Sequence, residues 1–170
     1  MRKQLLHILY ILFIINNCYT QNLVVFDSMC NNYIKGTVEL ATPKQVNKKR
    51  NITSVVFLDA RETKEYNISH IKGAINVGYN NFSISSVNDI DKNQHIYVYC
   101  SIGYRSEKIG EKLQKAGFKK VYNLYGGIFN WANFGYELLD QNEKPTTKVH
   151  GYNKKWSQWL NEKKCTRIVN

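Results

Sequence analysis

The feature that most constrains the fold of this chain is a cysteine placed between a strand-forming run and a helix. The run from Ile96 to Tyr99 is apolar and β-favouring, which is typical of a buried strand. From Arg105 to Ala116 the apolar residues recur at helical spacing, and Gly117 stands where a left-handed cap ends a helix. The pattern therefore places Cys100 at a strand-to-helix turn, above the N-terminus of the helix.

This position suits a reactive cysteine, because the thiolate is the nucleophilic form of the side chain. The unpaired N–H groups at a helix N-terminus and the positive end of its dipole favour an anion. Gly103 allows the short loop to turn its N–H groups inward, and Arg105 adds a fixed charge or braces the loop. The alternative is that Cys100 is simply a buried cysteine at the end of a strand, which is common.

Strand-like and helix-like segments alternate along the chain. The nearly continuous apolar run from Ser54 to Leu58 is typical of a strand covered on both faces. Thr42 and Pro43 form a helix start, with the helix running toward Lys48. Further strands are expected at 38–40, 74–77 and 121–124, and short helices at 62–66 and 127–134. The alternation predicts an α/β fold with a mostly parallel sheet and helices on both faces. In such sheets, ligands bind beyond the carboxyl ends of the strands, where Cys100 falls.

Two further motifs flank the cysteine loop. Upstream stands Asp59-Ala60-Arg61-Glu62 at the end of a strand, followed by His70-Ile71-Lys72-Gly73-Ala74-Ile75-Asn76. Downstream, Gly117-Phe118 is followed by Val121, Leu124, Gly126-Gly127 and Trp131. In this order and spacing, the chain from about Gly36 to Leu138 resembles the rhodanese family of sulfurtransferases. The resemblance implies a rhodanese-like fold with a central sheet of about five strands.

The resemblance also implies roles for individual side chains. Cys100 would carry sulfur as a covalent persulfide, with no bound cofactor. The active-site loop would consist of Ser101, Ile102, Gly103, Tyr104 and Arg105. Arg61 would help to bind an anionic donor at the edge of the cleft, whereas Asp59 and Glu62 would fix backbone and arginine geometry. His70 would hold its loop in place. The four histidines are far apart in sequence and show no metal-ligand spacing, so we expect no metal site.

The length of the loop separates two enzyme classes that share this architecture by resemblance. Phosphatases of the cell-cycle type place five residues between the cysteine and the arginine, whereas Cys100 and Arg105 are separated by four. The longer loop surrounds a tetrahedral phosphate, and the shorter one suits a single extra sulfur atom on the cysteine. The expected reaction is therefore sulfur transfer.

The substrates follow from the same resemblance. The donor would be a small anionic sulfur compound such as thiosulfate, a polysulfide or a persulfide, and the acceptor a thiol or cyanide. Thiosulfate-active rhodaneses often have a basic residue directly after the cysteine, but this chain has Ser101. A persulfide-bearing thiol or a protein persulfide is therefore favoured as the donor. Two other functions stay open: a non-catalytic binding module, and a redox protein in which Cys100 forms mixed disulfides.

The two ends of the chain carry separate signals. A basic start followed by a short apolar run predicts a signal peptide at 1–20, and hence a secreted or periplasmic protein. The run is too short for a membrane span. Lipid attachment at Cys18 is the alternative, although Asn17 fits a lipoprotein box poorly. Residues 21–35 are expected to form a lead-in and 36–140 the rhodanese-like domain. A linker and an accessory helix over Tyr152–Lys163 are expected within 141–170.

The net charge and the remaining cysteines constrain the function less than the motifs do. The formal net charge of +11 helps solubility and attracts small anions, but no nucleic-acid motif accompanies it. We therefore expect no nucleic-acid partner, and we expect a monomer. Cys30 and Cys165 lie in opposite flanking segments, and the sequence leaves open whether they form a disulfide.

Overall fold

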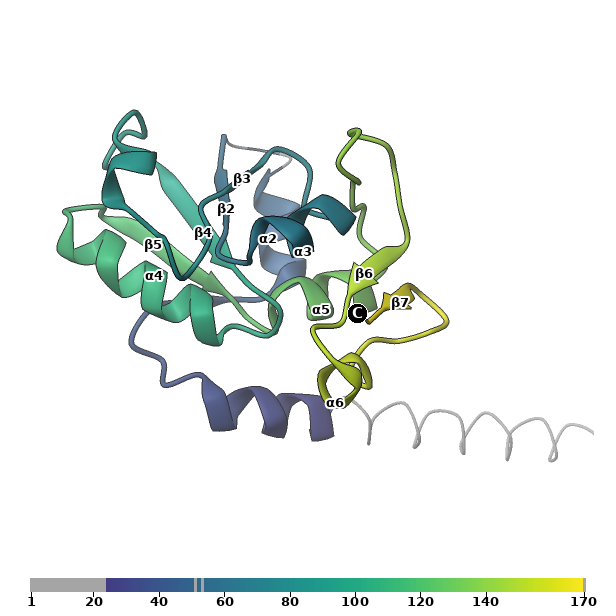
Figure 1. Cartoon of the computed structure of the whole chain (residues 1–170). Coiled ribbons are helices and arrows are strands. Elements are labelled where there is room, and N and C mark those ends of the chain that lie inside the picture. Colours follow the sequence, from purple (N-terminus) through teal and green to yellow (C-terminus); the bar gives the residue numbers. More distant parts are fainter. Residues whose placement is uncertain (1–23, 51, 53, 170) are drawn as a thin grey trace, which may run out of the picture.

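The structure, a computed structural model, describes residues 24–50, 52 and 54–169 (Figure 1). The predicted signal peptide, including Cys18, lies outside the described residues. Within the described part of the chain, no helix is both long enough and apolar enough to cross a membrane.

Five parallel strands form the central sheet, in the order β1-β5-β4-β2-β3. Their bounds are β1 Glu39–Ala41, β2 Val56–Asp59, β3 Ala74–Asn76, β4 His95–Tyr99 and β5 Lys120–Leu124. The central position of β4 brings its carboxyl end, and therefore Cys100, between two neighbouring strands. The α/β fold with a parallel sheet of about five strands is confirmed.

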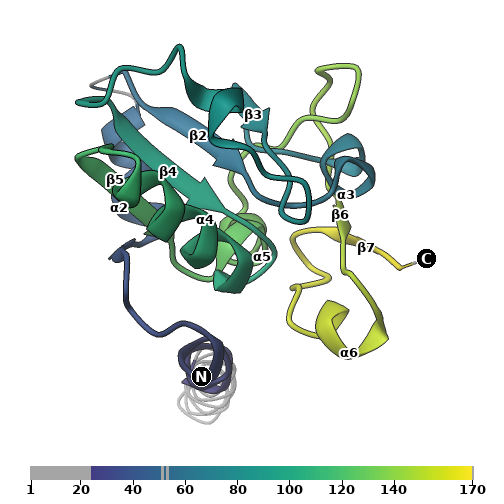
Figure 2. The same ribbon diagram turned by 60° about the vertical axis from the view of Figure 1, so that its left-hand side comes forward.

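The sheet is covered on both faces because the side chains of its strands alternate between two apolar cores. In β4, Ile96 and Val98 belong to one core, and Tyr97 and Tyr99 to the other. The first core is closed by α4 (Tyr104–Lys115) and the 3-10 helix η1 (Ile84–Val87). The second is closed by α2 (Pro43–Arg50), α3 (Thr63–Ile68) and α5 (Gly127–Asn133). The helices α4 and α2 accordingly lie on opposite sides of the strands (Figure 2).

The start of α2 shows why its sequence prediction holds. Pro43 occupies the first helical position, where its missing N–H is not needed. The Thr42 N–H donates to Oε1 of Gln45 at 2.9 Å, and the Gln45 N–H donates to the Thr42 hydroxyl oxygen at 3.3 Å. This reciprocal pair is a capping box, which local sequence alone specifies.

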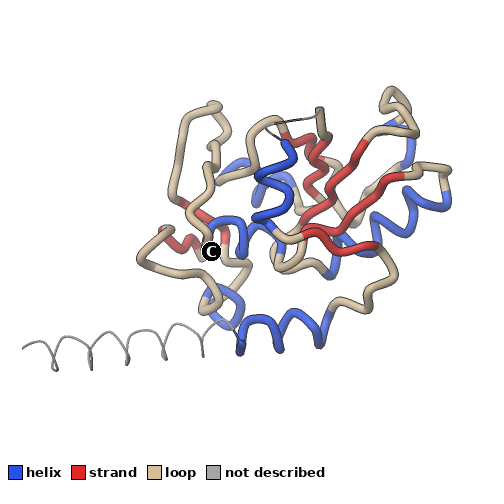
Figure 3. Tube along the Cα trace, turned by 180° about the vertical axis from the view of Figure 1, so that it is seen from behind, coloured by secondary structure: helices blue, strands red, loops and turns tan. Residues whose placement is uncertain are grey.

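The flanking segments differ from the sequence prediction. Residues 24–33 form a helix, here the N-terminal helix, where only an apolar lead-in was expected. The prediction of an accessory helix over Tyr152–Lys163 is wrong in its extent, since α6 spans only Lys154–Ser157. Two strands that the pattern did not indicate, β6 (Lys148–His150) and β7 (Thr166–Ile168), form a small parallel sheet of their own. Figure 3 shows this pair apart from the main sheet.

The helix α6 ends early because side chains from other parts of the chain form hydrogen bonds with the backbone groups that would continue it. The Asn161 N–H donates to Oδ1 of Asn133 at 2.7 Å. The carbonyl of Leu160 accepts from Nε of Arg167 at 3.1 Å. These groups are therefore not available to extend α6.

The described cysteines are all buried and free. The possible disulfide between Cys30 and Cys165 is not formed in this structure.

Candidate active-site loop

Cys100 directly follows β4, and its side chain lies on the sheet face covered by α4. Its Sγ accepts a hydrogen bond from the Gly103 N–H at 3.2 Å, and the Ser106 hydroxyl oxygen lies 3.6 Å from it. Gly103 precedes α4 with φ +120°, and a side chain there would collide with Ile34 of the N-terminal flank. The loop of residues 100–105, here the Cys100 loop, therefore points the Gly103 N–H at the sulfur.

The start of α5 holds this loop from the other side. The N–H groups of Ile128 and Phe129 donate to the carbonyl oxygens of Cys100 and Ser101, at 2.8 and 3.2 Å. Gly127 has φ +55°, and a Cβ there would collide with the Cys100 carbonyl oxygen. The glycine thus permits a close approach that fixes the position of the cysteine backbone.

Asn123 and Ser106, to which the sequence analysis assigned no role, also support the Cys100 loop. The buried Asn123 on β5 donates from Nδ2 to the Gly103 carbonyl at 2.9 Å. Its Oδ1 accepts from the Ser106 hydroxyl at 2.7 Å. The signal was an asparagine inside an apolar strand, because a buried amide in such a run needs polar partners.

Arg105 lies in the loop but does not offer a free charge. Its Nη1 and Nη2 donate to the two carboxylate oxygens of Glu65 at 2.7 and 2.8 Å, and Nη2 also donates to the Ser101 hydroxyl at 3.1 Å. Burial raises the pKa of Glu65, but hydrogen bonds from Arg105 and the charges of Arg105 and Arg61 outweigh it and hold this pKa below its ordinary value. The sequence reasoning assigned no role to Glu65, which braces the loop from α3.

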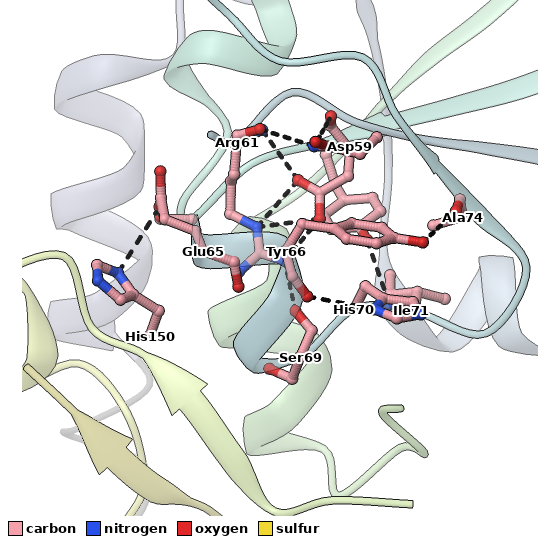
Figure 4. A network of polar contacts seen from close by, with 12 residues as sticks. Asp59, Arg61, Glu65, Tyr66, Ser69, His70, Ile71, Ala74 and His150 are labelled. Carbon is pink, nitrogen blue, oxygen red and sulfur yellow. Dashed lines mark hydrogen bonds and ion pairs between the residues drawn. The ribbon is translucent and has the colours of Figure 1, made fainter. Parts of the chain in front are cut away.

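The structure does not place Arg61 at the cleft edge, so that prediction is wrong. Its side chain is 0% exposed. Nε and Nη2 donate to the carboxylate of Asp59 at 2.9 and 2.6 Å, and Nη2 also donates to the Ser69 carbonyl at 2.7 Å (Figure 4). The nearby carboxylate and carbonyls satisfy the guanidinium inside the protein, so it does not face an incoming donor.

Glu62 and His70 lie in supporting positions. The Glu62 N–H donates to Oε2 of Glu65 at 3.1 Å, and its carboxylate accepts from Nδ2 of Asn80 at 3.0 Å. Nε2 of His70 lies 3.1 Å from Oε1 of Glu143. This contact ties the loop that contains His70 to the segment after α5. Among the residues that the structure describes, no group of three or more His, Cys, Asp or Glu side chains is arranged to hold a metal ion.

A cavity of about 460 Å³ opens over the loop. Its lining includes five residues of the Cys100 loop: Cys100, Ser101, Ile102, Tyr104 and Arg105. The remaining lining residues are aromatic and come from the flanking segments: Tyr33, Tyr152 and Trp156, here the aromatic rim.

The Rhodanese-like domain family matches residues 42–134, more than half of the chain. This chain belongs to the rhodanese-like domain family. Among solved structures, thiosulfate sulfurtransferase from Pseudomonas aeruginosa aligns with a TM-score of 0.57 at 23% identity, covering 68% of this chain and 22% of that chain. A rhodanese-like domain protein from Staphylococcus aureus aligns with a TM-score of 0.50 at 26% identity, covering 55% of this chain and 90% of the other.

Similar sequences occur inside longer proteins. A tRNA uridine(34) hydroxylase from Pelagibacter ubique is 38% identical over 91 residues, which cover 52% of this chain and 30% of that protein. The chain spans less than half the length of the first curated relatives that it matches. The likeness therefore concerns the rhodanese-like domain and not the whole of those proteins.

The aromatic rim lies entirely outside the rhodanese match. Tyr33 belongs to the N-terminal helix, whereas Tyr152 and Trp156 follow β6 near the C-terminus. The family pattern therefore describes the Cys100 loop under the cavity but not the aromatic rim.

Proposed function

We propose that this rhodanese-like protein is a sulfurtransferase that holds a transferred sulfur as a persulfide on Cys100. The observation that carries the proposal is the surroundings of the Cys100 sulfur. It accepts the Gly103 N–H, lies 3.6 Å from the Ser106 hydroxyl oxygen, and stands before the N-terminus of α4, below an open cavity. N–H donors and a helix N-terminus stabilise an anionic sulfur, both as thiolate and as persulfide.

The reaction takes place in two displacements. The Cys100 thiolate attacks the outer sulfur of the donor, a new S–S bond forms, and the donor's own bond to that sulfur breaks. The electron pair leaves with the remainder of the donor, which is a thiolate when the donor is a persulfide. The acceptor, cyanide or a thiol, then attacks the outer sulfur and restores the Cys100 thiolate.

The other loop residues position this chemistry. The ion pair between Arg105 and Glu65 fixes the end of the loop, and the Ser101 hydroxyl is held by Arg105. Because the Arg105 charge is already balanced, it attracts a dianion such as thiosulfate weakly. Together with the serine after the cysteine, this favours a persulfide-bearing thiol as the donor.

The test is persulfide formation on the purified protein. Incubation with glutathione persulfide, and in parallel with thiosulfate, is followed by intact-mass measurement and then by cyanide with detection of thiocyanate. A one-sulfur increment that cyanide discharges, and that Cys100→Ser abolishes, supports the proposal. Cys165→Ser, which changes another buried cysteine, is the matched control and should retain the increment.

Two other outcomes would point elsewhere. No increment from either donor, with Cys100 intact and able to react with an alkylating reagent, leaves a binding module. A dithiothreitol-reversible adduct without discharge of sulfur to cyanide indicates a thiol redox protein instead.

For its location, we propose export from the cytoplasm, supported by the signal-peptide pattern at 1–20. N-terminal sequencing of the protein from its own source tests this. A chain that begins at Gln21 supports export, and one that begins at Met1 contradicts cleavage.

A further inference from the structure

The cavity above Cys100 is larger and more apolar than a small inorganic donor requires. Its 460 Å³ corresponds to the liquid volume of roughly fifteen water molecules. Among the described residues that line it, Arg105 alone is charged, and Glu65 balances that charge. The walls are mainly aliphatic and aromatic: Tyr33, Ile102, Tyr104, Tyr152 and Trp156. A pocket of this size and lining is typical of sites for organic ligands.

The rim is built from two distant parts of the chain that meet. The rings of Tyr33 and Trp156 pack edge to face with their centres 5.0 Å apart, which joins the N-terminal helix to α6. Such a pair fixes the separation of two aromatic walls before a ligand arrives. The contact therefore holds the two flanking segments together at the rim.

Tyr152 adds a second observation at the same rim. Its backbone has φ +64°, which is costly for a residue with a side chain. Its N–H donates to Nδ1 of His150 at 3.1 Å, and its half-exposed ring lies over the Arg105 guanidinium, 5.8 Å from ring centre to Cζ. Backbone strain of this kind gathers at ligand sites. Here it directs an aromatic ring at the loop that carries the cysteine.

We infer that this pocket binds the apolar organic group of a small sulfane-sulfur donor, with the outer sulfur directed at Cys100. The inference rests on the proposed sulfur transfer and specifies its substrate class. With an organic thiosulfonate, the Cys100 thiolate bonds to the outer sulfur, the bond from that sulfur to the SO₂ group breaks, and the electron pair leaves with the sulfinate. Cys100 then carries an anionic persulfide, so charge and atoms balance.

The experiment compares two probes that share the reacting sulfur and the charge but differ in the organic group. Benzenethiosulfonate carries an aromatic ring, and methanethiosulfonate carries only a methyl group. The rate of persulfide formation on Cys100 is measured for each by rapid quenching and intact mass. The uncatalysed reaction of each probe with cyanide corrects for intrinsic reactivity. After this correction, the wild-type protein should prefer benzenethiosulfonate by about 10-fold or more.

Variants of the rim locate the preference. Tyr33→Ala and Trp156→Ala should each lower the rate with benzenethiosulfonate about 10-fold and leave the methanethiosulfonate rate within about 2-fold. Trp156→Phe should restore most of the preference, which separates ring contact from loss of folding. Phe134→Ala removes an exposed aromatic residue that does not line the cavity, and it should leave both rates unchanged.

The outcomes distinguish the two proposals. Equal corrected rates in the wild type, or rim variants that slow both probes equally, would overturn the inference about the organic group while sulfur transfer stands. If neither probe loads Cys100 but glutathione persulfide does, the inference about the organic group fails and sulfur transfer stands. If no donor loads Cys100 with sulfur, the proposed function itself fails.

Discussion

The rhodanese-like core and the flanking segments meet at one cavity but contribute opposite chemistry. The core, residues 42–134, supplies the cysteine loop, the Arg105–Glu65 ion pair that holds it, and the completely buried Arg61–Asp59 ion pair. Among the residues that the structure describes, the flanks supply rings and no charged side chain to the lining. The difference suggests that the reaction belongs to the core and the choice of substrate to the flanks.

The ion pairs of the two regions differ as much as their linings. Arg61 and Asp59 are both completely buried, whereas in the flank Glu162, the partner of Arg167, is 72% exposed. A buried charge that loses its partner is costly, while an exposed pair contributes little. The core should therefore be sensitive to a single lost charge, and the flank should not.

Asp59→Asn should give the largest effect on stability. It leaves the buried Arg61 guanidinium without a counter-charge, so the free energy of unfolding should fall by about 3–5 kcal/mol. Urea denaturation measures this. Glu162→Gln is the control in the flank and should change the midpoint far less. Similar losses from the two variants would remove the energetic distinction between core and flank.

Glu65→Gln should have a smaller effect that depends on pH. At pH 7 the loss of the charged hydrogen bonds to Arg105 should cost about 1.5–3 kcal/mol. Because the pKa of Glu65 is lowered in the folded state, its carboxylate stabilises the wild type above the unfolded value of about 4.3, and this contribution disappears as the pH falls through the folded pKa.

The difference in stability between wild type and Glu65→Gln should therefore shrink as the pH is lowered from 7 to 3. Denaturation curves at several pH values measure it. A difference that stays constant over this range would show that the carboxylate charge is not what braces the loop.

Tyr152→Gly should have the smallest effect on stability. Glycine relieves the left-handed backbone, but the ring over Arg105 is lost, and the two changes are similar in size, each about 1 kcal/mol. Thermal melting should accordingly change little. A large loss of stability would mean that this part of the rim also holds the core together.

Much of the core could be predicted because its signals are local. The alternation in β4, the Thr42 capping box and the position of Cys100 before α4 each depend on residues that are close in sequence. The supporting positions of Glu65 and Asn123 could not be assigned in the same way. Each acts on the loop from a different element, and only packing of the sheet brings these elements together.

Within the rhodanese-like core, the sequence by itself determined the order of strands and helices, the turn that presents Cys100 and membership of the family, because periodicity, caps and motif spacing are local properties of the chain. Only the tertiary structure decided that Arg61 is buried and that α6 stops after one turn. It also decided that Tyr33 meets Trp156 above the cysteine. Burial and long-range contacts arise when distant segments fold against one another, and no local pattern records which of them will meet.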